Sequence, residues 1–507
     1  ILVQRGVRLV GVAVVTVVLA AACATSFEVK IDGVAAVAPN ATPTADAEPT
    51  PTPAPAPSDD DPVVEPTTPP AATPQVAPPA STPTVTPIPI VELTYADAID
   101  IYFDDVERFW TSASPEAFGM EFSPVSERIP YDIADDDTIP ACGGEIGPRD
   151  LYDGNAFYCE PEDYIAWDDV GLFPDLYENS GPFTLGLVIA HEYGHAVQAA
   201  AGFDGATIFV ELQSDCLAGA WAGAVARGES PAVPFARGDL DDAIGGSLTF
   251  ADPLGTSAGD PGAHGTAFDR VNAFAEAFEG GVPVCLDYIS DPPQTATLLI
   301  DRFDETAGNF PMEDLLPLLT ADLSAFLDAL GQPVSPGFNA PVSPVEFGGP
   351  LGDPPPCGGL AVSADATAGS AYYCEDDGQV YIDRGELDEL WREAGDFAPS
   401  YLVAHSYATS LVAEFISDDP AAAVLAADCI VGVWARDVFD EAAARPAEPV
   451  HQLILSAGDL DEAIVGLLLV PPLGPSLTEP EGLVTFDRVA EFGRGFFRGV
   501  SQCRLSA

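Results

Sequence analysis

The feature that most constrains this 507-residue chain is an internal repetition of short phrases in the same order. The second set of phrases follows the first at an offset that stays between 213 and 220 residues. The matched pairs are NAFYC (155–159) and SAYYC (370–374), SDCLAGAWA (214–222) and ADCIVGVWA (427–435), GDLDDAI (238–244) and GDLDEAI (458–464), and FDRVNAF (268–274) and FDRVAEF (486–492). This order at a nearly fixed offset indicates a tandem duplication. We therefore expect two copies of one fold.

Each copy is predicted to be mainly helical with a minor sheet. Apolar residues recur at helical spacing over 96–110, 183–200 and 206–226. Between Cys142 and Asp168, short aromatic and β-branched runs indicate a small hairpin or edge strands. The predicted fold class is α+β, predominantly helical.

The N-terminal part of the chain is predicted to stay outside these folded copies. Arg5 and Arg8 precede an uncharged apolar run that ends in three alanines and Cys23, the layout of a lipoprotein-type signal peptide over residues 1–23. An ordinary signal peptide with a chance cysteine is the alternative. Residues 24–95 are rich in Pro, Thr and Ala, so we expect a disordered, extended stalk.

Composition indicates export and excludes nucleic acid as a partner. The chain has 80 acidic and 18 basic residues, and its net charge of −62 repels phosphate backbones. Besides Cys23 there are eight cysteines, an even number that suits disulfides in an oxidising compartment. We expect a bacterial cell-envelope lipoprotein on the outer face of the cytoplasmic membrane, with the lipid anchor as its only membrane contact.

Cysteine spacing is nearly equal in the two copies, which we place at residues 96–290 and 291–507. The near pairs are 17 residues apart in both copies, and the far pairs are 69 and 74 residues apart. This spacing predicts four disulfides, Cys142–Cys159, Cys216–Cys285, Cys357–Cys374 and Cys429–Cys503.

The string HEYGH at 191–195 indicates a metal site. His191 and His195 are four residues apart, so on a helix both imidazoles leave the same face and can bind one Zn²⁺. Glu192 is then placed to act as general base on a zinc-activated water. Two surface histidines on an amphipathic helix are the alternative, but the preceding LGLVIA is typical of a buried helix.

A catalytic zinc site needs a third protein ligand and an open position. Glu211 and Asp215 are four residues apart on the next predicted helix. We predict Glu211 as the third ligand and Asp215 as the acceptor that orients a ligating histidine. Solvated acids in a very acidic chain are the alternative. His264 is a candidate donor to the oxyanion formed during peptide hydrolysis, with an exposed loop histidine as the alternative.

Several separated motifs resemble the neutral zinc metallopeptidase family of bacteria. They are ACGG, AFYC, HEYGHAVQ (191–198), ELQSDCLAGAWA (211–222) and HGTAFDRVNAF (264–274), in family order. The resemblance covers roughly residues 96–290. It implies a zincin-like fold, with His191, His195 and Glu211 as zinc ligands and Glu192 as the catalytic acid/base.

The second copy lacks this site. At the positions of the two histidines, the general base and the third ligand it carries His405, Thr409, Ser406 and Val424. We therefore expect one Zn²⁺ per chain and a degenerate second copy that serves as a scaffold or substrate platform. The duplication also allows an intramolecular pseudo-dimer.

The sequence thus predicts an exported, lipid-anchored zinc metallopeptidase that acts on peptide or protein substrates. The alternative is a non-catalytic cell-envelope binding or assembly lipoprotein with a structural zinc site. Glu192 favours the enzyme, because a structural site needs no carboxylate beside its ligands.

Overall fold

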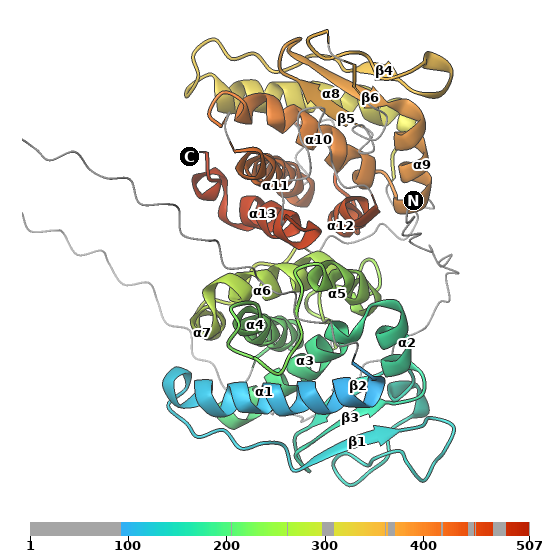
Figure 1. The fold of residues 1–507 in the computed structure, drawn as a ribbon, viewed down its shortest axis with the longest axis vertical. Coiled ribbons are helices and arrows are strands. Elements are labelled where there is room, and N and C mark those ends of the chain that lie inside the picture. The colour runs from blue at the N-terminus through green and yellow to red at the C-terminus, as the bar shows by residue number, and fades with distance from the viewer. Residues whose placement is uncertain are drawn as a thin grey trace, which may run out of the picture. The chain divides into compact units, whose positions relative to one another are not determined.

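The computed structural model describes residues 93–505 except 204, 261, 297–308, 360, 363–370, 417–418, 445–450, 452 and 470–482. The predicted signal peptide with Cys23, and the predicted stalk up to residue 92, lie outside the described residues. The described residues belong to one compact unit, α+β and mainly helical, with two small sheets (Figure 1). Among the described residues, no helix is long and apolar enough to cross a membrane.

The elements come in two similar series. The first is α1 (Tyr95–Ala117), β1 (Glu127–Tyr131), η1 (Arg149–Leu151), β2 (Ala156–Cys159), β3 (Tyr164–Asp168), α2 (Leu172–Asn179), α3 (Pro182–Ala201), α4 (Thr207–Ala226), α5 (Asp239–Ser247), η2 (Leu248–Phe250), α6 (Ala267–Gly280) and α7 (Val282–Ser290). The second is α8 (Met312–Gly331), β4 (Val345–Phe347), η3 (Gly349–Leu351), β5 (Ala371–Cys374), β6 (Gln379–Asp383), α9 (Arg384–Ala394), α10 (Phe397–Val412), α11 (Pro420–Ala444), α12 (Asp459–Leu469), α13 (Thr485–Arg498) and η5 (Val500–Gln502). We call residues 93–290 the first half and residues 291–505 the second half.

The two sheets share one topology. In the order β1-β3-β2, the central strand β3 pairs parallel with β1 and antiparallel with β2. In β4-β6-β5 the central strand β6 pairs in the same two ways with β4 and β5. The β2–β3 hairpin lies within the segment predicted to hold strands. Strand β1 was not predicted; its Pro130 is tolerated because β1 is an edge strand.

The helices pack closely where glycine replaces a side chain. A Cβ added to Gly219 of α4 would lie 2.1 Å from the carbonyl oxygen of Phe274 in α6. At the matching place, a Cβ on Gly432 of α11 would lie 2.0 Å from the carbonyl oxygen of Phe492 in α13. A larger residue would force these helices apart. The same close crossing therefore occurs in both halves.

Four disulfide bonds join the eight cysteines in the described part of the chain, and each bond lies within one half. They are Cys142–Cys159, Cys216–Cys285, Cys357–Cys374 and Cys429–Cys503, the pairs predicted from the spacing. Such bonds fit an extracellular protein.

The two halves contact each other through matching residues. Asp461 of α12 accepts a hydrogen bond from the backbone N–H of Phe268 in α6 (2.8 Å). Asp241 of α5 accepts hydrogen bonds from the backbone N–H groups of Thr485 (3.0 Å) and Phe486 (2.8 Å) in α13. Each half thus supplies a carboxylate to the first turn of a helix in the other half.

Candidate metal centre

Helix α3 carries both histidines of the HEYGH string. It ends at Gly202, which adopts the left-handed conformation (φ 70°) that favours glycine at a helix C-terminus. His191 and His195 leave the same face, as the spacing predicts, and their Nε2 atoms lie 3.1 Å apart. Gly194 allows α4 to cross here, since a Cβ on Gly194 would lie 3.0 Å from the Cα of Ser214. The crossing brings Glu211 of α4 beside the histidines.

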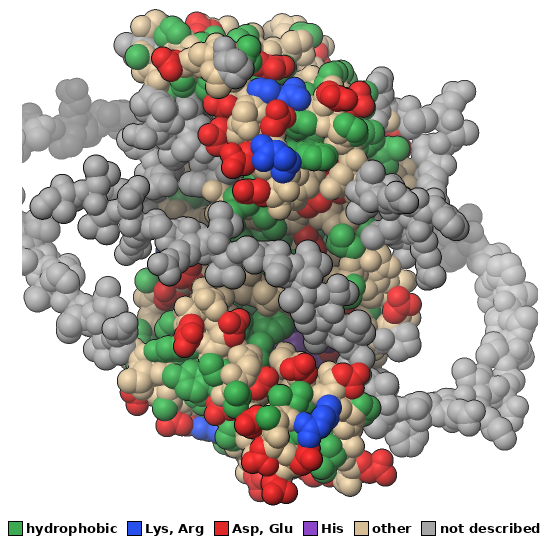
Figure 2. Space-filling model, turned by 90° about the vertical axis from the view of Figure 1, so that its right-hand side faces the viewer, with side chains coloured by type: hydrophobic (Ala, Val, Ile, Leu, Met, Phe, Trp, Pro, Cys, Tyr) green, Lys and Arg blue, Asp and Glu red, His purple; other side chains and the backbone are tan. Residues whose placement is uncertain are grey.

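Glu211 completes a cluster of three potential ligand atoms. Its Oε2 lies 3.2 Å from Nε2 of His191 and 3.5 Å from Nε2 of His195. The three ligand atoms all lie within 4.8 Å of one another. The side chain of His195 is 19% exposed and that of Glu211 is 6% exposed. The cluster is therefore open to solvent on the His195 side. In Figure 2 a histidine is visible in a recess of the surface.

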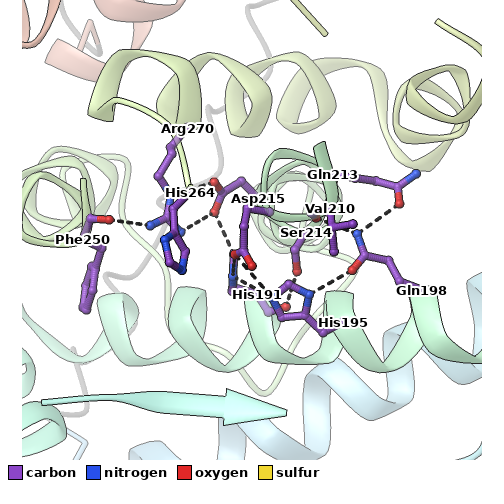
Figure 3. A network of polar contacts seen from close by, with 12 residues as sticks. His191, His195, Gln198, Val210, Gln213, Ser214, Asp215, Phe250, His264 and Arg270 are labelled. Atoms are coloured by element: carbon purple, nitrogen blue, oxygen red, sulfur yellow. Dashed lines mark hydrogen bonds and ion pairs between the residues drawn. The ribbon is translucent and has the colours of Figure 1, made fainter. Parts of the chain in front are cut away.

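Asp215 lies within hydrogen-bond distance of His191. Its Oδ1 lies 2.8 Å from Nδ1 of His191, and its two oxygens accept hydrogen bonds from Arg270 at 2.8 and 2.9 Å (Figure 3). Burial raises the pKa of Asp215, but Arg270 and His191 outweigh that effect and hold the pKa below its usual value. An ionised Asp215 only accepts, so Nδ1 of His191 carries the hydrogen and Nε2 faces the cluster.

Arg270 was not predicted as part of the site. It lies in the phrase FDRV, which occurs in both copies. The sequence signal for its role is that Arg270 recurs as Arg488, just as Asp215 recurs as Asp428.

A chain of amides orients His195, and the sequence analysis missed it too. Nδ1 of His195 lies 2.9 Å from Oε1 of Gln198 (Figure 3). The amide of Gln198 is fixed because its Nε2 donates to the carbonyl of Val210 (2.7 Å) and to Oε1 of Gln213 (3.1 Å). Gln213 in turn donates to the carbonyl of Cys285 (2.9 Å). Oε1 of Gln198 therefore accepts, and Nε2 of His195 also faces the cluster.

The three atoms that face one another each offer a lone pair, so they need a positive charge between them. With both Nδ1 atoms donating, two imidazole lone pairs and one carboxylate oxygen converge without a donor between them. Burial lowers the pKa of His191, but Asp215, Glu211 and Glu192 outweigh it and raise that pKa to about 10. A single proton can satisfy one pair of these atoms, whereas one divalent cation satisfies all three. Two imidazoles and a carboxylate are a ligand set that zinc uses in hydrolases.

Glu192 lies next to this cluster and is buried. Burial raises the pKa of its carboxyl group, while the two histidines and a hydrogen bond from the backbone N–H of Tyr158 lower it, and the net shift is upward. A carboxyl group with a raised pKa can take up and release a proton nearer neutral pH. Tyr193, the next residue, is a packing residue, fully buried with its hydroxyl donating to Glu107.

His264 lies beside Arg270 at one end of the network (Figure 3). Its Nδ1 is 3.4 Å from Oδ1 of Asp252, which also accepts the backbone N–H groups of His264 and Gly265 through Oδ2. The side chain is 39% exposed. The structure therefore holds His264 at a solvent-facing position, and its catalytic role stays a prediction.

The matching place in the second half is filled by protein. His405 is buried with its Nε2 3.3 Å from Asp428, and Asp428 accepts the hydroxyl of Tyr401 and two bonds from Arg488. His405 thus meets its aspartate through Nε2 rather than Nδ1, so its ring is turned relative to that of His191. Burial lowers the pKa of His405 to about 4. A neutral ring beside the apolar Val424 offers no set of converging ligands.

Residues 141–288 match the model of a family described as "Putative neutral zinc metallopeptidase". The matched residues include all three members of the cluster, together with Glu192, Asp215, His264 and Arg270. The resemblance recognised from the motifs is thereby confirmed.

Proteins similar to part of this chain occur in Mycobacterium and in Escherichia coli. The uncharacterized protein Rv2575 of Mycobacterium tuberculosis is 31% identical over 29% of this chain and 58% of its own length. The uncharacterized protein YpfJ of Escherichia coli is 30% identical over 25% of this chain and 51% of its own length. The chain thus spans little more than half the length of these curated relatives. No solved structure gives a significant match to it.

Proposed function

We propose that this chain is a zinc metallopeptidase that hydrolyses peptide bonds in peptide or protein substrates. The observation that carries the proposal is the convergence of His191, His195 and Glu211 as three acceptors with no donor between them. One zinc ion would be held there. When bound, zinc supplies a Lewis acid that polarises a carbonyl and lowers the pKa of water.

The protein side chains would divide the remaining work. Glu192 would take the proton of the attacking water and hand it to the leaving amine, for which its burial and raised pKa suit it. Asp215 and Gln198 would keep the two imidazoles in the tautomer that leaves Nε2 free. The exposure at His195 would admit the substrate.

The chain would be a tandem duplication of a zincin-like domain. Its second half would be a degenerate copy that binds no metal. The shared sheet topology and the matching disulfides support this interpretation. The exchanged carboxylates of Asp241 and Asp461 support an intramolecular pseudo-dimer of residues 96–290 and 291–507. Acidic side chains dominate over basic ones on the face in Figure 2, consistent with no nucleic-acid partner. We further propose export with a lipid anchor at Cys23.

The direct test is hydrolysis of an unfolded, labelled protein such as casein by the purified chain. Cleavage should stop with a zinc chelator, return when zinc is added back, and be absent in Glu192→Gln. Zinc that is retained without any cleavage, in the wild type as in Glu192→Gln, would instead support a structural site in a binding lipoprotein.

We also propose His264 as a donor to the oxyanion. His264→Ala should keep its zinc while kcat falls by about 10²-fold, the usual effect of removing one such donor. Steady-state kinetics with parallel metal analysis decide this, and unchanged turnover would make His264 an ordinary loop residue.

A further inference from the structure

We propose that the second half positions the metal centre and does so through Asp461. This inference rests on the zinc site of the proposed function. Asp461 contacts none of the three ligands. It acts through α6, the helix that carries Arg270, so it is a positioning residue.

The first step is the N-terminus of α6. The first amides of a helix have no partner within it and need acceptors from outside. In α6 the hydroxyl of Thr266 accepts the N–H of Asp269 (3.1 Å). Asp461 accepts the N–H groups of Phe268 (2.8 Å) and Ala267. Two of these three N–H groups are therefore capped by a residue of the opposite half of the molecule.

The second step leads from this turn to the ligand. Arg270 is the fourth residue of α6. It donates twice to Asp215 (2.8 and 2.9 Å) and once to the carbonyl of Phe250 (2.8 Å). Asp215 then holds Nδ1 of His191 at 2.8 Å. If the first turn of α6 frays, Arg270 moves, and Asp215 and His191 lose their common anchor.

The same turn is also held by side-chain packing against the second half. The ring of Phe268 lies 5.1 Å from that of Phe492, 5.3 Å from that of Phe496 and 5.5 Å from that of Phe497. The residue whose amide Asp461 accepts is thus surrounded by α13. This packing keeps the N-terminus of α6 within reach of Asp461.

The chain contains a second, matching series of contacts, but this series leads to His405, which is not one of the proposed zinc ligands. Asp241 accepts the amides of Thr485 and Phe486 in α13, the helix whose Arg488 donates twice to Asp428 (2.8 and 2.6 Å). Asp428 in turn lies 3.3 Å from His405. Removing Asp241 therefore breaks the same type of contact between the halves without touching the zinc ligands.

The experiment compares Asp461→Ala with Asp241→Ala in the full chain, with zinc affinity measured by chelator competition and Tm by calorimetry. Both variants should lose similar thermal stability. Asp461→Ala should bind zinc about fivefold more weakly, somewhat less than the 10- to 100-fold typical for a residue bonded directly to a ligand. Asp241→Ala should bind zinc like the wild type. Asp461→Asn keeps one oxygen acceptor and should recover most of the affinity.

Two outcomes would overturn the proposal. One is equal zinc affinity in Asp461→Ala and the wild type, and the other is equal weakening in both alanine variants, which would make the effect one of general stability. A route through Arg270 also requires that Asp461→Ala have no further effect on zinc affinity in an Arg270→Ala background. If Asp461→Ala does not fold, the comparison of Asp461→Asn with Asp241→Asn applies the same criteria. A wild-type chain that binds no zinc would instead refute the proposed function itself.

Discussion

At the scale of single residues, the site depends on partners that fix its ligands. Arg270 and Arg488 occupy matching positions and each donates twice to an aspartate. Only the aspartate of the first half, Asp215, holds a histidine of the ligand cluster. Comparing the two arginines therefore tests a role at the proposed metal site separately from a role in the stability of the fold.

We expect Arg270→Ala to weaken zinc binding by about 10- to 100-fold, since His191 loses the anchored carboxylate that orients it. Arg488→Ala should lower Tm and leave zinc affinity unchanged. Isothermal titration of the metal-free chain with zinc measures both effects. An Arg270→Ala chain that binds zinc as tightly as the wild type would show that Asp215 needs no partner.

The proximity of the residues in the HEYGH string was predictable, and the network of contacts around them was not. His191, His195 and Glu192 follow from a local pattern, because helical geometry alone sets which side chains share a face. Arg270 meets Asp215 across two helices, 55 residues apart in sequence. The bonds of Gln198 and Gln213 likewise depend on how α4 crosses α3. Periodicity within one helix carries no information about such crossings.

At the scale of elements, three carboxylates meet where α10 and α12 begin. Asp396, Asp459 and Glu462 have oxygens within 4.8 Å of one another. Burial raises the pKa of Glu462 to about 8, with Asp396 and Asp461 adding to the shift and a hydrogen bond from the N–H of Phe397 opposing it. Burial also raises the pKa of Asp396 to about 6. Between the pKa of the unfolded chain and the raised pKa of the folded chain, Asp396 and Glu462 therefore keep protons that the unfolded chain would release.

This cluster predicts a pH-dependent stability. The folded-state pKa of Glu462 lies above its usual value of 4.5, so its contribution is fully present below pH 4.5 and is lost as pH rises toward 8. Glu462→Gln stays neutral and should raise the free energy of unfolding by about 4 kcal/mol at pH 8.5, with almost no difference from the wild type near pH 4.5. Urea unfolding at both pH values measures this. A Gln variant that is no more stable at pH 8.5 would contradict the shift.

Long periodic elements were predicted better than short ones. The helices expected over 96–110, 183–200 and 206–226 are α1, α3 and α4; the ends of α3 and α4 differ by at most one residue, whereas α1 continues to Ala117. The short strand β1 pairs with β3, which lies more than thirty residues further along the chain. Its sequence, ERIPY, has no alternating pattern that would reveal this pairing.

At the scale of the whole molecule, the second half resembles the first but carries Thr409 and Val424 where the first half has His195 and Glu211. Both halves keep their disulfides, their sheet topology and their buried tryptophans, Trp221 and Trp434. Cysteine spacing was enough to predict the pairing because it recurs in both copies. The exchange of Asp241 and Asp461 between the halves was not predictable, since it depends on how the copies pack.

The central claim is that one zinc site exists per chain and that it is catalytic. The most direct measurement is the zinc-to-protein ratio of the purified wild type, Glu192→Gln and Glu211→Ala, with peptide hydrolysis measured on the same samples. We predict a ratio near one for the wild type and for Glu192→Gln, with hydrolysis only in the wild type, and loss of both metal and hydrolysis in Glu211→Ala. A ratio near two, or normal cleavage by Glu192→Gln, would contradict the account.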